Sequence, residues 1–343
     1  MIAPASLRAR NPIALTMGEP AGIGGEIAIK AWLERKKYKL PPFFVIGDPH
    51  WLAAIDPQAA IREITAPSEC AARFKLALPV LPLRLAKAAL PGKPDAGNAE
   101  AVLAAIRVGV KLAKHGAISA LVTNPIEKAV LYGAGFSHPG HTEFLAELTG
   151  ATKPPVMLLA CPASGKDPGL RVAPVTVHLP LAEVAAQIDR TRIIETARTV
   201  AAALAGDFGI AAPRLAIAAL NPHAGEQGAL GSEEIEIIAP AVADLMGMGI
   251  NAQGPFPADT LFHAGARRRF DCVICMYHDQ ALIPLKTIDF ARGVNVTLGL
   301  DIVRTSPDHG VALDIAGQGV ADPASLIAAL HMARDIARSR YDG

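Results

Sequence analysis

Short apolar segments alternate with helix-like segments along the whole chain, and this alternation constrains the fold more than any other feature. Helical periodicity is clear over residues 98–114, for example, and stops just before Gly116. Strands that alternate with helices are typical of parallel βαβ units, whose sheet is covered on both faces. The strand-like runs lie at residues 13–17, 43–46, 120–123, 156–159, 170–177, 215–220, 272–276 and 294–298. We therefore predict an α/β fold with mostly parallel sheets.

Length and charge narrow the class of protein. The chain has 343 residues, 51% of them hydrophobic, which is enough for two α/β domains with their own cores. Its 33 Lys and Arg residues nearly balance its 32 Asp and Glu residues, and no basic block occurs, so we expect no nucleic-acid partner. No apolar run approaches the roughly 18 residues of a membrane-spanning helix, and the short run before Gly18 does not fit a secretory signal. We expect a cytoplasmic protein with no membrane partner.

The four cysteines do not form a disulfide framework, because they are few and widely scattered. Cys272 and Cys275 form a lone C-x-x-C motif within a strand-like run. Side chains three positions apart on a strand face opposite ways, so this pair is poorly placed to chelate a metal or form a bridge. We interpret both as core residues.

Three predicted strands end in a histidine. His178 follows the run 170–177, His223 follows the run that ends at Leu220, and His278 follows the run 272–276. The carboxyl ends of parallel strands meet at one edge of a sheet, where ligands bind. Imidazole is a common ligand of zinc and related ions, and three protein ligands with an open position describe a catalytic metal site. The alternative is three hydrogen-bonded core or loop histidines with no common role.

Candidate anion-binding residues lie near these histidines in the sequence. Thr142 is placed to cap a helix with Glu143 in its first turn, and a helix start attracts anions. Lys286, Asn295 and Arg304 follow at intervals of nine residues, at the edges of apolar runs. These positions favour phosphate or carboxylate binding. A simple capped helix and ordinary surface ion pairs are the alternatives.

Two glycine-rich stretches are candidate ligand loops. MGEPAGIGGE, residues 17–26, matches neither G-x-G-x-x-G nor a P-loop, so it indicates close backbone approach to a ligand better than it indicates a nucleotide. DHGVALDIAGQGVADP, residues 308–323, contains Asp314 and Asp322, whose carboxylates are suited to binding ribose hydroxyls. Asp322 is equally explained as the N-cap of the last helix, with Pro323 at its first position.

From about residue 12 to residue 335, the chain resembles the 4-hydroxythreonine-4-phosphate dehydrogenase family of pyridoxal-phosphate biosynthesis. The blocks that carry the resemblance are ALTMGEPAGIGGEI, VTNPIEKA, PGHTEFLAELTG, NPHAGEQGALGSEE, GPFPADTLF and YHDQALIPLKTIDFARGVNVTLGLDIVRTSPDHGVALDIAGQG. The resemblance implies two α/β/α domains like those of isocitrate and isopropylmalate dehydrogenases, with the active site in the interdomain cleft. We expect a discontinuous cofactor-binding domain of residues 1–139 and 303–343. Residues 140–302 would then form the metal, substrate and dimerisation domain.

The resemblance also implies roles for individual residues. It implies a homodimer with metal ligands from both subunits, and NAD or NADP as cofactor with one Zn, Mg or Co ion per active site. The catalytic proton acceptor is open, with Lys286, Asp259 and Asp279 as candidates. By position in the motifs, the metal ligands are His178, His223 and His278, the substrate contacts are His141, Thr142, Lys286, Asn295 and Arg304, and the cofactor contacts are Gly310, Asp314 and Asp322.

The implied reaction is the NAD-dependent oxidation of 4-phosphooxy-L-threonine to the 3-oxo acid, which loses carbon dioxide to give 3-amino-2-oxopropyl phosphate. One alternative is a paralogous dehydrogenase that acts on threonate 4-phosphate, erythronate 4-phosphate or a dicarboxylate dihydrodiol. A more distant one is a phosphate acyltransferase of similar fold, and a non-catalytic metal-dependent binding protein is a third. A metal analysis and an assay of NADH production discriminate among these classes.

The chain departs from the family pattern at a few positions. The first loop usually reads D-P-A-G-I-G-P-E, whereas Glu19 and Gly25 stand here at the acidic and proline positions. P-I-N-K becomes P-I-E-K, which puts Glu127 beside Lys128 and puts a phosphate-binding role for this lysine in doubt. The three histidines of the implied metal site are unchanged.

Overall fold

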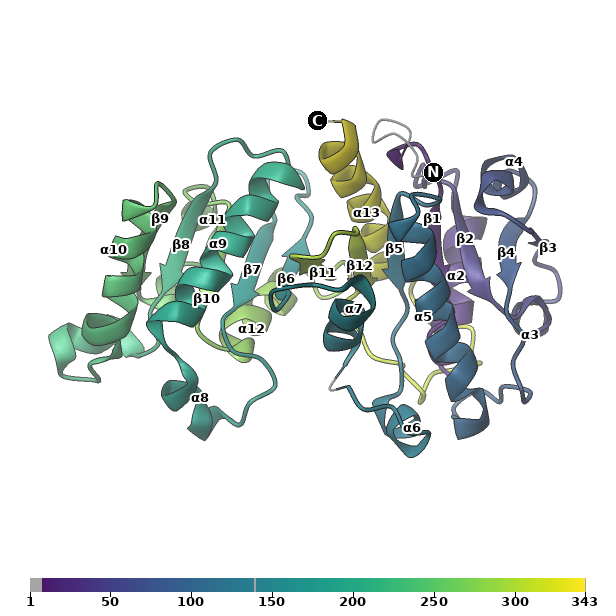
Figure 1. Ribbon diagram of the computed structural model, residues 1–343, viewed down its shortest axis with the longest axis horizontal. Coiled ribbons are helices and arrows are strands. Elements are labelled where there is room, and N and C mark those ends of the chain that lie inside the picture. The colour runs from purple at the N-terminus through teal and green to yellow at the C-terminus, as the bar shows by residue number, and fades with distance from the viewer. Residues whose placement is uncertain (1–7, 139, 343) are drawn as a thin grey trace. The chain divides into compact units, whose positions relative to one another are not determined.

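The computed structural model describes residues 8–138 and 140–342 (Figure 1). The predicted cofactor-binding domain, residues 1–139 and 303–343, includes residues 1–7, 139 and 343, which lie outside the described residues. The chain divides into two compact units, one formed by the residues up to Pro155 together with Leu300–Gly343, and the other by Val156–Gly299. Among the described residues, no helix is both long enough and apolar enough to cross a membrane.

Unit 1 contains a parallel sheet. Its strand order is β3-β4-β2-β1-β5-β12, and all the pairs within it run parallel. Strands β1, β2 and β5 are buried at every position, as expected of a sheet covered on both faces. The strands are β1 (Ile13–Thr16), β2 (Phe43–Gly47), β3 (Ile61–Glu63), β4 (Leu78–Pro82), β5 (Ala120–Thr123) and β12 (Arg304–Pro307).

The helices of unit 1 cover this sheet. Helix α5 packs on β1, β2 and β5 and crosses the front of the sheet in Figure 1, while α13 packs on β5, β12 and α2. Helix α13 begins at Ala324, one residue later than predicted, and the Asp322 carboxylate accepts a hydrogen bond from Ala324 N (2.9 Å). The helices are α2 (Gly24–Leu33), α3 (Pro49–Ile55), α4 (Cys70–Phe74), α5 (Ala99–Lys114), α6 (Lys128–Gly133), α7 (His141–Thr149) and α13 (Ala324–Asp342), with short 3₁₀ turns η1 (Pro67–Glu69) and η2 (Ala96–Asn98).

Unit 2 contains a mixed sheet of order β11-β6-β7-β10-β8-β9. Strands β7, β10, β8 and β9 are parallel, whereas β6 is antiparallel to both β7 and β11. Simple βαβ alternation did not predict this reversal. Only residues 162–169 separate β6 from β7, too few for a parallel crossover. The strands are β6 (Val156–Cys161), β7 (Leu170–Pro174), β8 (Arg214–Ala218), β9 (Asn251–Phe256), β10 (Cys272–Cys275) and β11 (Val294–Leu298).

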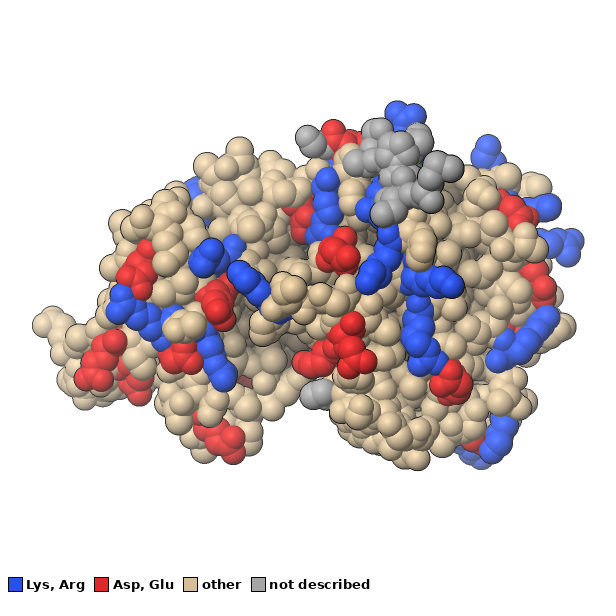
Figure 2. All heavy atoms as spheres, viewed as in Figure 1, with Lys and Arg blue, Asp and Glu red and all other residues tan. Residues whose placement is uncertain are grey.

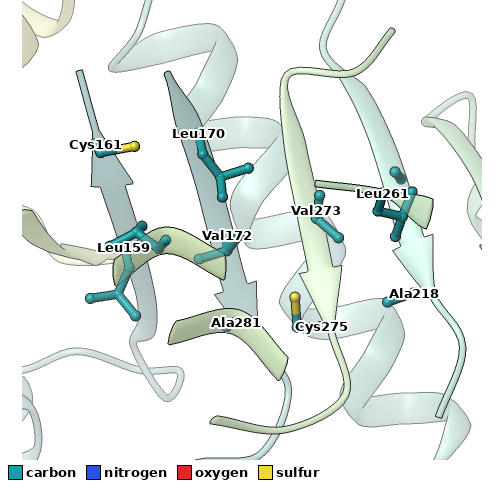
Figure 3. Close-up of a cluster of buried hydrophobic side chains, with 11 residues drawn as sticks. Leu159, Cys161, Leu170, Val172, Ala218, Leu261, Val273, Cys275 and Ala281 are labelled. Atoms are coloured by element: carbon teal, nitrogen blue, oxygen red, sulfur yellow. The ribbon is translucent and has the colours of Figure 1, made fainter. Parts of the chain in front are cut away.

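The core of unit 2 lies between the sheet and α12. Helix α12 packs on β6, β7 and β10, and α9 packs on β6, β8, β10 and β11. Alternate residues of four strands form one apolar cluster with Ala281 and Leu285 of α12 (Figure 3). The elements are α8 (Leu181–Gln187), α9 (Arg190–Gly206), α10 (Ala239–Gly247), α11 (Ala264–Arg267), α12 (His278–Ile288), the left-handed segment η3 (Pro222–Gly228), the 3₁₀ turn η5 (Ala258–Thr260) and the π-helical turn η4 (Glu234–Ile238).

The cysteines behave as predicted. All four are free and buried, and Cys275 belongs to the cluster of Figure 3. Burial raises the pKa of the Cys272 thiol to about 12, so this group stays a protonated core thiol at neutral pH. On the face shown in Figure 2, basic and acidic side chains are interspersed, in keeping with the balanced composition.

The boundary between the units differs from the predicted one. We expected residues 140–155 to belong to the second domain, whereas the structure groups them with unit 1. Helix α7 packs against α5, and the Lys114 ammonium donates hydrogen bonds to the carbonyls of Leu148 (3.4 Å) and Thr149 (3.0 Å). These contacts attach α7 to α5 of unit 1. The functional roles assigned to the two domains remain predictions.

Candidate functional site

The three histidines follow three neighbouring strands of unit 2. Strands β7, β10 and β8 lie side by side and run parallel, with Cys275 in register with Pro174 and Ile274 in register with Ile217. Their carboxyl ends therefore lie at one edge of the sheet. His178, His223 and His278 each follow one of these ends within a few residues. The apolar runs thus predicted correctly which edge of the sheet the three histidines follow.

His178 and His278 face each other directly. Their ring centroids are 5.9 Å apart. Just after the paired residues of β7 and β10, Thr176 connects the loops that follow these two strands. Its N and Oγ1 both donate hydrogen bonds to Met276 O (3.2 and 2.8 Å). The sequence did not single out this threonine, although it holds two candidate ligands at their spacing.

Asp279 orients His278. His278 Nδ1 lies 2.6 Å from Asp279 Oδ1, and in the tautomer with the proton on Nδ1 this contact leaves Nε2 as an acceptor. Carboxylates commonly fix a ligating histidine in this way. Asp279 was one candidate for the proton acceptor, and its position fits an orienting role better. Asp259, another candidate, lies exposed on η5, which adjoins the η3 segment that carries His223.

His223 lies in a backbone conformation that L-amino acids rarely adopt. Its φ is 52°, and the next four residues also have positive φ. Within the single chain, the described residues contain no group of three His, Cys, Asp or Glu side chains placed to hold a metal ion. His178 and His278 therefore form a pair here, and the role of His223 as third ligand remains a proposal.

Gln280 links two of the strand ends and was not predicted. This buried side chain accepts a hydrogen bond from Met276 N (2.7 Å) and donates one to Ala219 O (2.7 Å). It therefore ties the end of β10 to the end of β8, the strands that precede His278 and His223. Its place in the first turn of α12 gave no sign of this role in the sequence.

Replacing Gln280 with leucine should destabilise the protein by about 2–4 kcal/mol. The reason is that Met276 N and Ala219 O, both fully buried, would each lose a partner at a cost of roughly 1–3 kcal/mol. Urea unfolding followed by circular dichroism measures the change. Thr287→Ala, an exposed position on the same helix, is the matched control and should change stability by less than about 0.5 kcal/mol. An unchanged midpoint for Gln280→Leu would contradict the assigned role.

Lys286 and Asn295 also belong to unit 2. Lys286 lies in the last turn of α12, about two turns after His278, and its ammonium lies 5.1 Å from the centre of the Phe290 ring. Asn295 lies on β11, and its Oδ1 is buried without a hydrogen-bond partner among the described residues. A buried amide oxygen of this kind is suited to accept a hydrogen bond from a ligand.

Two predicted substrate contacts, Arg304 and His141, lie in unit 1. This arginine, the first residue of β12, is 3% exposed, and its Nε and Nη2 both donate to Thr123 Oγ1 at the end of β5 (3.2 and 2.6 Å). Burial lowers the pKa of its guanidinium to about 10, so it stays charged at neutral pH. A buried cation of this kind is well suited to bind a phosphate or carboxylate.

His141 lies beside this cation. Its Nε2 is buried and has no hydrogen-bond partner within the described part of the chain. Burial, together with the positive charges of Arg304 and Lys128, holds the pKa of His141 well below its ordinary value, so the ring is neutral at pH 7. The Lys128 ammonium also lies near the start of α7, 3.3 Å from where a Cβ on Gly140 would be. Lys128 thus lies near the predicted ligand His141, and a phosphate-binding role for this lysine remains a proposal.

Thr142 is not the cap of α7, contrary to our expectation. The helix begins at His141 after the extended Gly140, so Thr142 lies inside its first turn. Glu143 does lie in the first turn, as predicted. Thr142 is partly exposed and remains a proposed substrate contact.

The glycine-rich loop 17–26 approaches other parts of the chain itself. A Cβ on Gly22 would lie 2.5 Å from Val311 Cγ1, and one on Gly18 would lie 2.6 Å from Asn124 Cβ. We expected these glycines to indicate close approach of a ligand. Packing between protein segments already explains why these positions need a residue without a Cβ.

The second glycine-rich stretch is fastened to α2. The Lys30 ammonium donates to the carbonyls of Gly319 (2.8 Å) and Ala321 (2.7 Å) and pairs with Glu26 (2.8 Å). Gly310 and Asp314 are exposed, and a Cβ on Gly310 would meet nothing within 4 Å. The Asp322 carboxylate accepts a hydrogen bond from Ala324 N at the start of α13, close to the capping role that was one of its two predicted roles. The cofactor role of these three residues remains a proposal.

Comparisons with known proteins agree on one family. The family model described as "Pyridoxal phosphate biosynthetic protein PdxA" matches residues 39–333. A 4-hydroxythreonine-4-phosphate dehydrogenase of Caulobacter vibrioides is 53% identical, over 96% of this chain and 98% of the relative. The crystal structure of an enzyme of the same name from Klebsiella pneumoniae is similar with a TM-score of 0.82 and 38% identity, covering 95% of this chain and 99% of that one.

A dehydrogenase of another name is also similar. The structure of a terephthalate 1,2-cis-dihydrodiol dehydrogenase from Burkholderia xenovorans matches with a TM-score of 0.62 and 28% identity, covering 95% of this chain and 98% of that one. The fold is therefore shared by enzymes named for different substrates. The two-unit, mostly parallel α/β architecture predicted from the sequence is confirmed by these likenesses.

Proposed function

Because the chain belongs to the PdxA family, oxidoreductases of pyridoxal phosphate biosynthesis whose members are named 4-hydroxythreonine-4-phosphate dehydrogenase, we propose that it oxidises 4-phosphooxy-L-threonine with NAD⁺. The 3-oxo acid formed then loses carbon dioxide and gives 3-amino-2-oxopropyl phosphate. The observation that carries this proposal is the placement of three histidines beyond the carboxyl ends of three neighbouring parallel strands.

A divalent cation fits the chemistry of these residues. The rings of His178 and His278 lie close enough to provide two imidazole ligands to one cation, and Asp279 contacts Nδ1 of His278. We assign the third ligand to His223. Zn²⁺ and Co²⁺ suit imidazole ligands, and Mg²⁺ binds them more weakly. Such a cation, when bound, polarises the substrate hydroxyl and lowers its pKa. The proton acceptor stays open between Lys286 and Asp259, since the Asp279 carboxylate contacts His278.

Exposed apolar side chains support the proposal that a homodimer completes the site. Leu179 and Leu181, which follow His178, are 37% and 73% exposed, and Leu230 and Ile235, which follow the His223 segment, are 45% and 55% exposed. Exposed apolar surface of this kind is typical of protein interfaces. We propose that a second copy of the chain covers these residues and shares the metal ligands.

The basic residues of unit 1 are assigned to the charged groups of the substrate. Arg304, Lys128 and the neutral His141 would bind an anionic end, and Asn295 and Thr142 would contribute further hydrogen bonds. The 308–323 stretch, with Gly310, Asp314 and Asp322, is assigned to the adenosine part of NAD. This cofactor would supply the acceptor for the hydride of the carbinol carbon.

A substrate panel tests the proposal. Purified protein should reduce NAD⁺, followed at 340 nm, with 4-phosphooxy-L-threonine and not with unphosphorylated 4-hydroxythreonine. Treatment with EDTA should abolish the activity, and Zn²⁺ or Co²⁺ should restore it. Full activity after removal of the metal would contradict the metal assignment. Faster turnover of threonate 4-phosphate, erythronate 4-phosphate or a dihydrodiol would favour the paralogous alternative. The Burkholderia likeness supports only the dihydrodiol among these substrates.

A further inference from the structure

The chain around His223 adopts a left-handed turn that needs external support. Residues 223–227 have φ values of 52°, 55°, 76°, 43° and 57°, and Gly225 is the one glycine among these five residues. Residues with a Cβ disfavour this conformation, so consecutive left-handed residues persist only where the surrounding structure holds them in place. The residue that would bind the metal thus depends on its neighbours for its position.

Glu234 holds the chain just before this turn. Its carboxylate is almost fully buried and accepts hydrogen bonds from Leu220 N and Asn221 N (both 2.8 Å) and from Asn221 Nδ2 (3.0 Å). Three donors on one buried carboxylate fix its geometry strongly. Asn221 stands two residues before His223.

The same carboxylate lies against the turn on the other side of His223. A Cβ on Gly225 would be 2.6 Å from Glu234 Oε2, so the glycine lets the backbone approach the carboxylate. Gly225 O also accepts a hydrogen bond from Leu230 N (3.0 Å), which closes the segment. Glu234 therefore holds the chain by hydrogen bonds two residues before His223 and lies close against it two residues after.

We propose that Glu234 is a positioning residue, which sets the metal affinity of the site by holding His223 in its left-handed turn. The inference rests on the proposed function, because it takes His223 to be a metal ligand. Glu234 acts through backbone amides and Gly225, not through contact with the metal. The neighbouring Glu233 provides a natural comparison, since it bonds the Asn221 side chain (2.7 Å) and neither backbone amide.

The test is Co²⁺ titration of the full-length protein, followed by visible absorption, together with amide hydrogen exchange of residues 220–228 without metal. Glu234→Gln replaces one acceptor oxygen with a donor, so we expect Co²⁺ affinity to fall about 10–100-fold, as for other residues that orient metal ligands. Exchange at residues 220–228 should become faster while exchange in β7 and β10 stays unchanged. Gly225→Ala keeps the carboxylate but displaces the turn, and should weaken Co²⁺ binding similarly. Glu233→Gln, the matched control, should bind Co²⁺ within about threefold of the wild type.

The outcomes separate this inference from the proposed function. His178→Ala should lose Co²⁺ binding regardless of Glu234. If wild type and His178→Ala bind Co²⁺ equally, the proposed metal site is contradicted, and the inference about Glu234 is contradicted with it. If His178→Ala loses Co²⁺ while Glu234→Gln keeps wild-type affinity, the inference alone is overturned. Equal losses in Glu234→Gln and Glu233→Gln, with faster exchange throughout unit 2, would also overturn it, because the role would then be general stability.

Discussion

Replacing His278 with alanine should lower the rate of NADH formation about 10³-fold and leave the protein folded. The side chain is partly exposed and contacts Asp279 and the ring of His178, so its loss opens no core cavity. Removing one of three proposed ligands removes several kcal/mol of charge stabilisation at the reacting hydroxyl, and about 1.4 kcal/mol corresponds to each tenfold change in rate. Steady-state assays and metal content by mass spectrometry of the purified variant measure both effects.

A surface histidine provides the control for this experiment. His50 is exposed, and the Asp48 carboxylate accepts from its backbone N, not from its ring, so His50→Ala should keep full activity and metal content. Thermal unfolding of both variants should stay within a few degrees of the wild type. A His278→Ala protein with wild-type turnover would exclude this histidine from the reaction and would leave the three-histidine assignment without support.

The fold was largely predictable because its signals are local. Apolar runs such as 43–46 and 120–123 form strands that are buried at every position, as continuous short apolar runs do in parallel sheets. Four strands gave no such signal. Strand β3 is mostly exposed, β4 contains two prolines, β9 is polar at several positions, and β12 starts with the buried Arg304. These segments form strands because they pair with a neighbouring strand, and the residue pattern alone does not indicate which strand that is.

The candidate site was predictable where side-chain type alone indicates chemistry. Histidines at strand ends and isolated basic residues could be identified without coordinates, and the structure confirms that His178 and His278 face each other. The residues that hold them could not be predicted. Gln280 and Glu234 act through backbone groups of other segments, and such contacts depend on how distant parts of the chain pack.

The structure shows the physical surroundings of the positions where the chain departs from the family pattern. A Cβ on Gly25, where the family has proline, would lie 2.4 Å from Ile55 Cδ1 and 2.7 Å from Trp51 Cζ2. Trp51 Nε1 also donates to Pro20 O (3.0 Å), so this aromatic ring supports the loop from α3 and leaves room only for glycine. Burial raises the pKa of Glu19, and the charge of the nearby Glu127, the other acidic departure, raises it further.

Replacing Arg304 with methionine should lower kcat/KM for the phosphorylated substrate about 10³-fold. Losing one partner of a buried charge pair costs about 2–5 kcal/mol, because the anion of the substrate would enter the site without its cation. Arg304→Lys keeps the charge but not the two-nitrogen contact with Thr123 Oγ1, and we expect a smaller loss of about tenfold. Steady-state kinetics with saturating NAD⁺ measure both variants.

The pKa of His141 provides a second measurement on the same variants. Arg304 contributes to the lowering of this pKa, so removal of the arginine should raise it toward the ordinary value near 6.5, whereas burial should still keep it below that value. NMR titration of the imidazole follows the change. Arg334→Met, which removes a surface arginine paired with Asp335, is the control and should alter neither the kinetics nor the pKa of His141. If the His141 pKa rises in Arg304→Met while kcat/KM stays at the wild-type value, Arg304 is a neighbour of the site and not a substrate ligand.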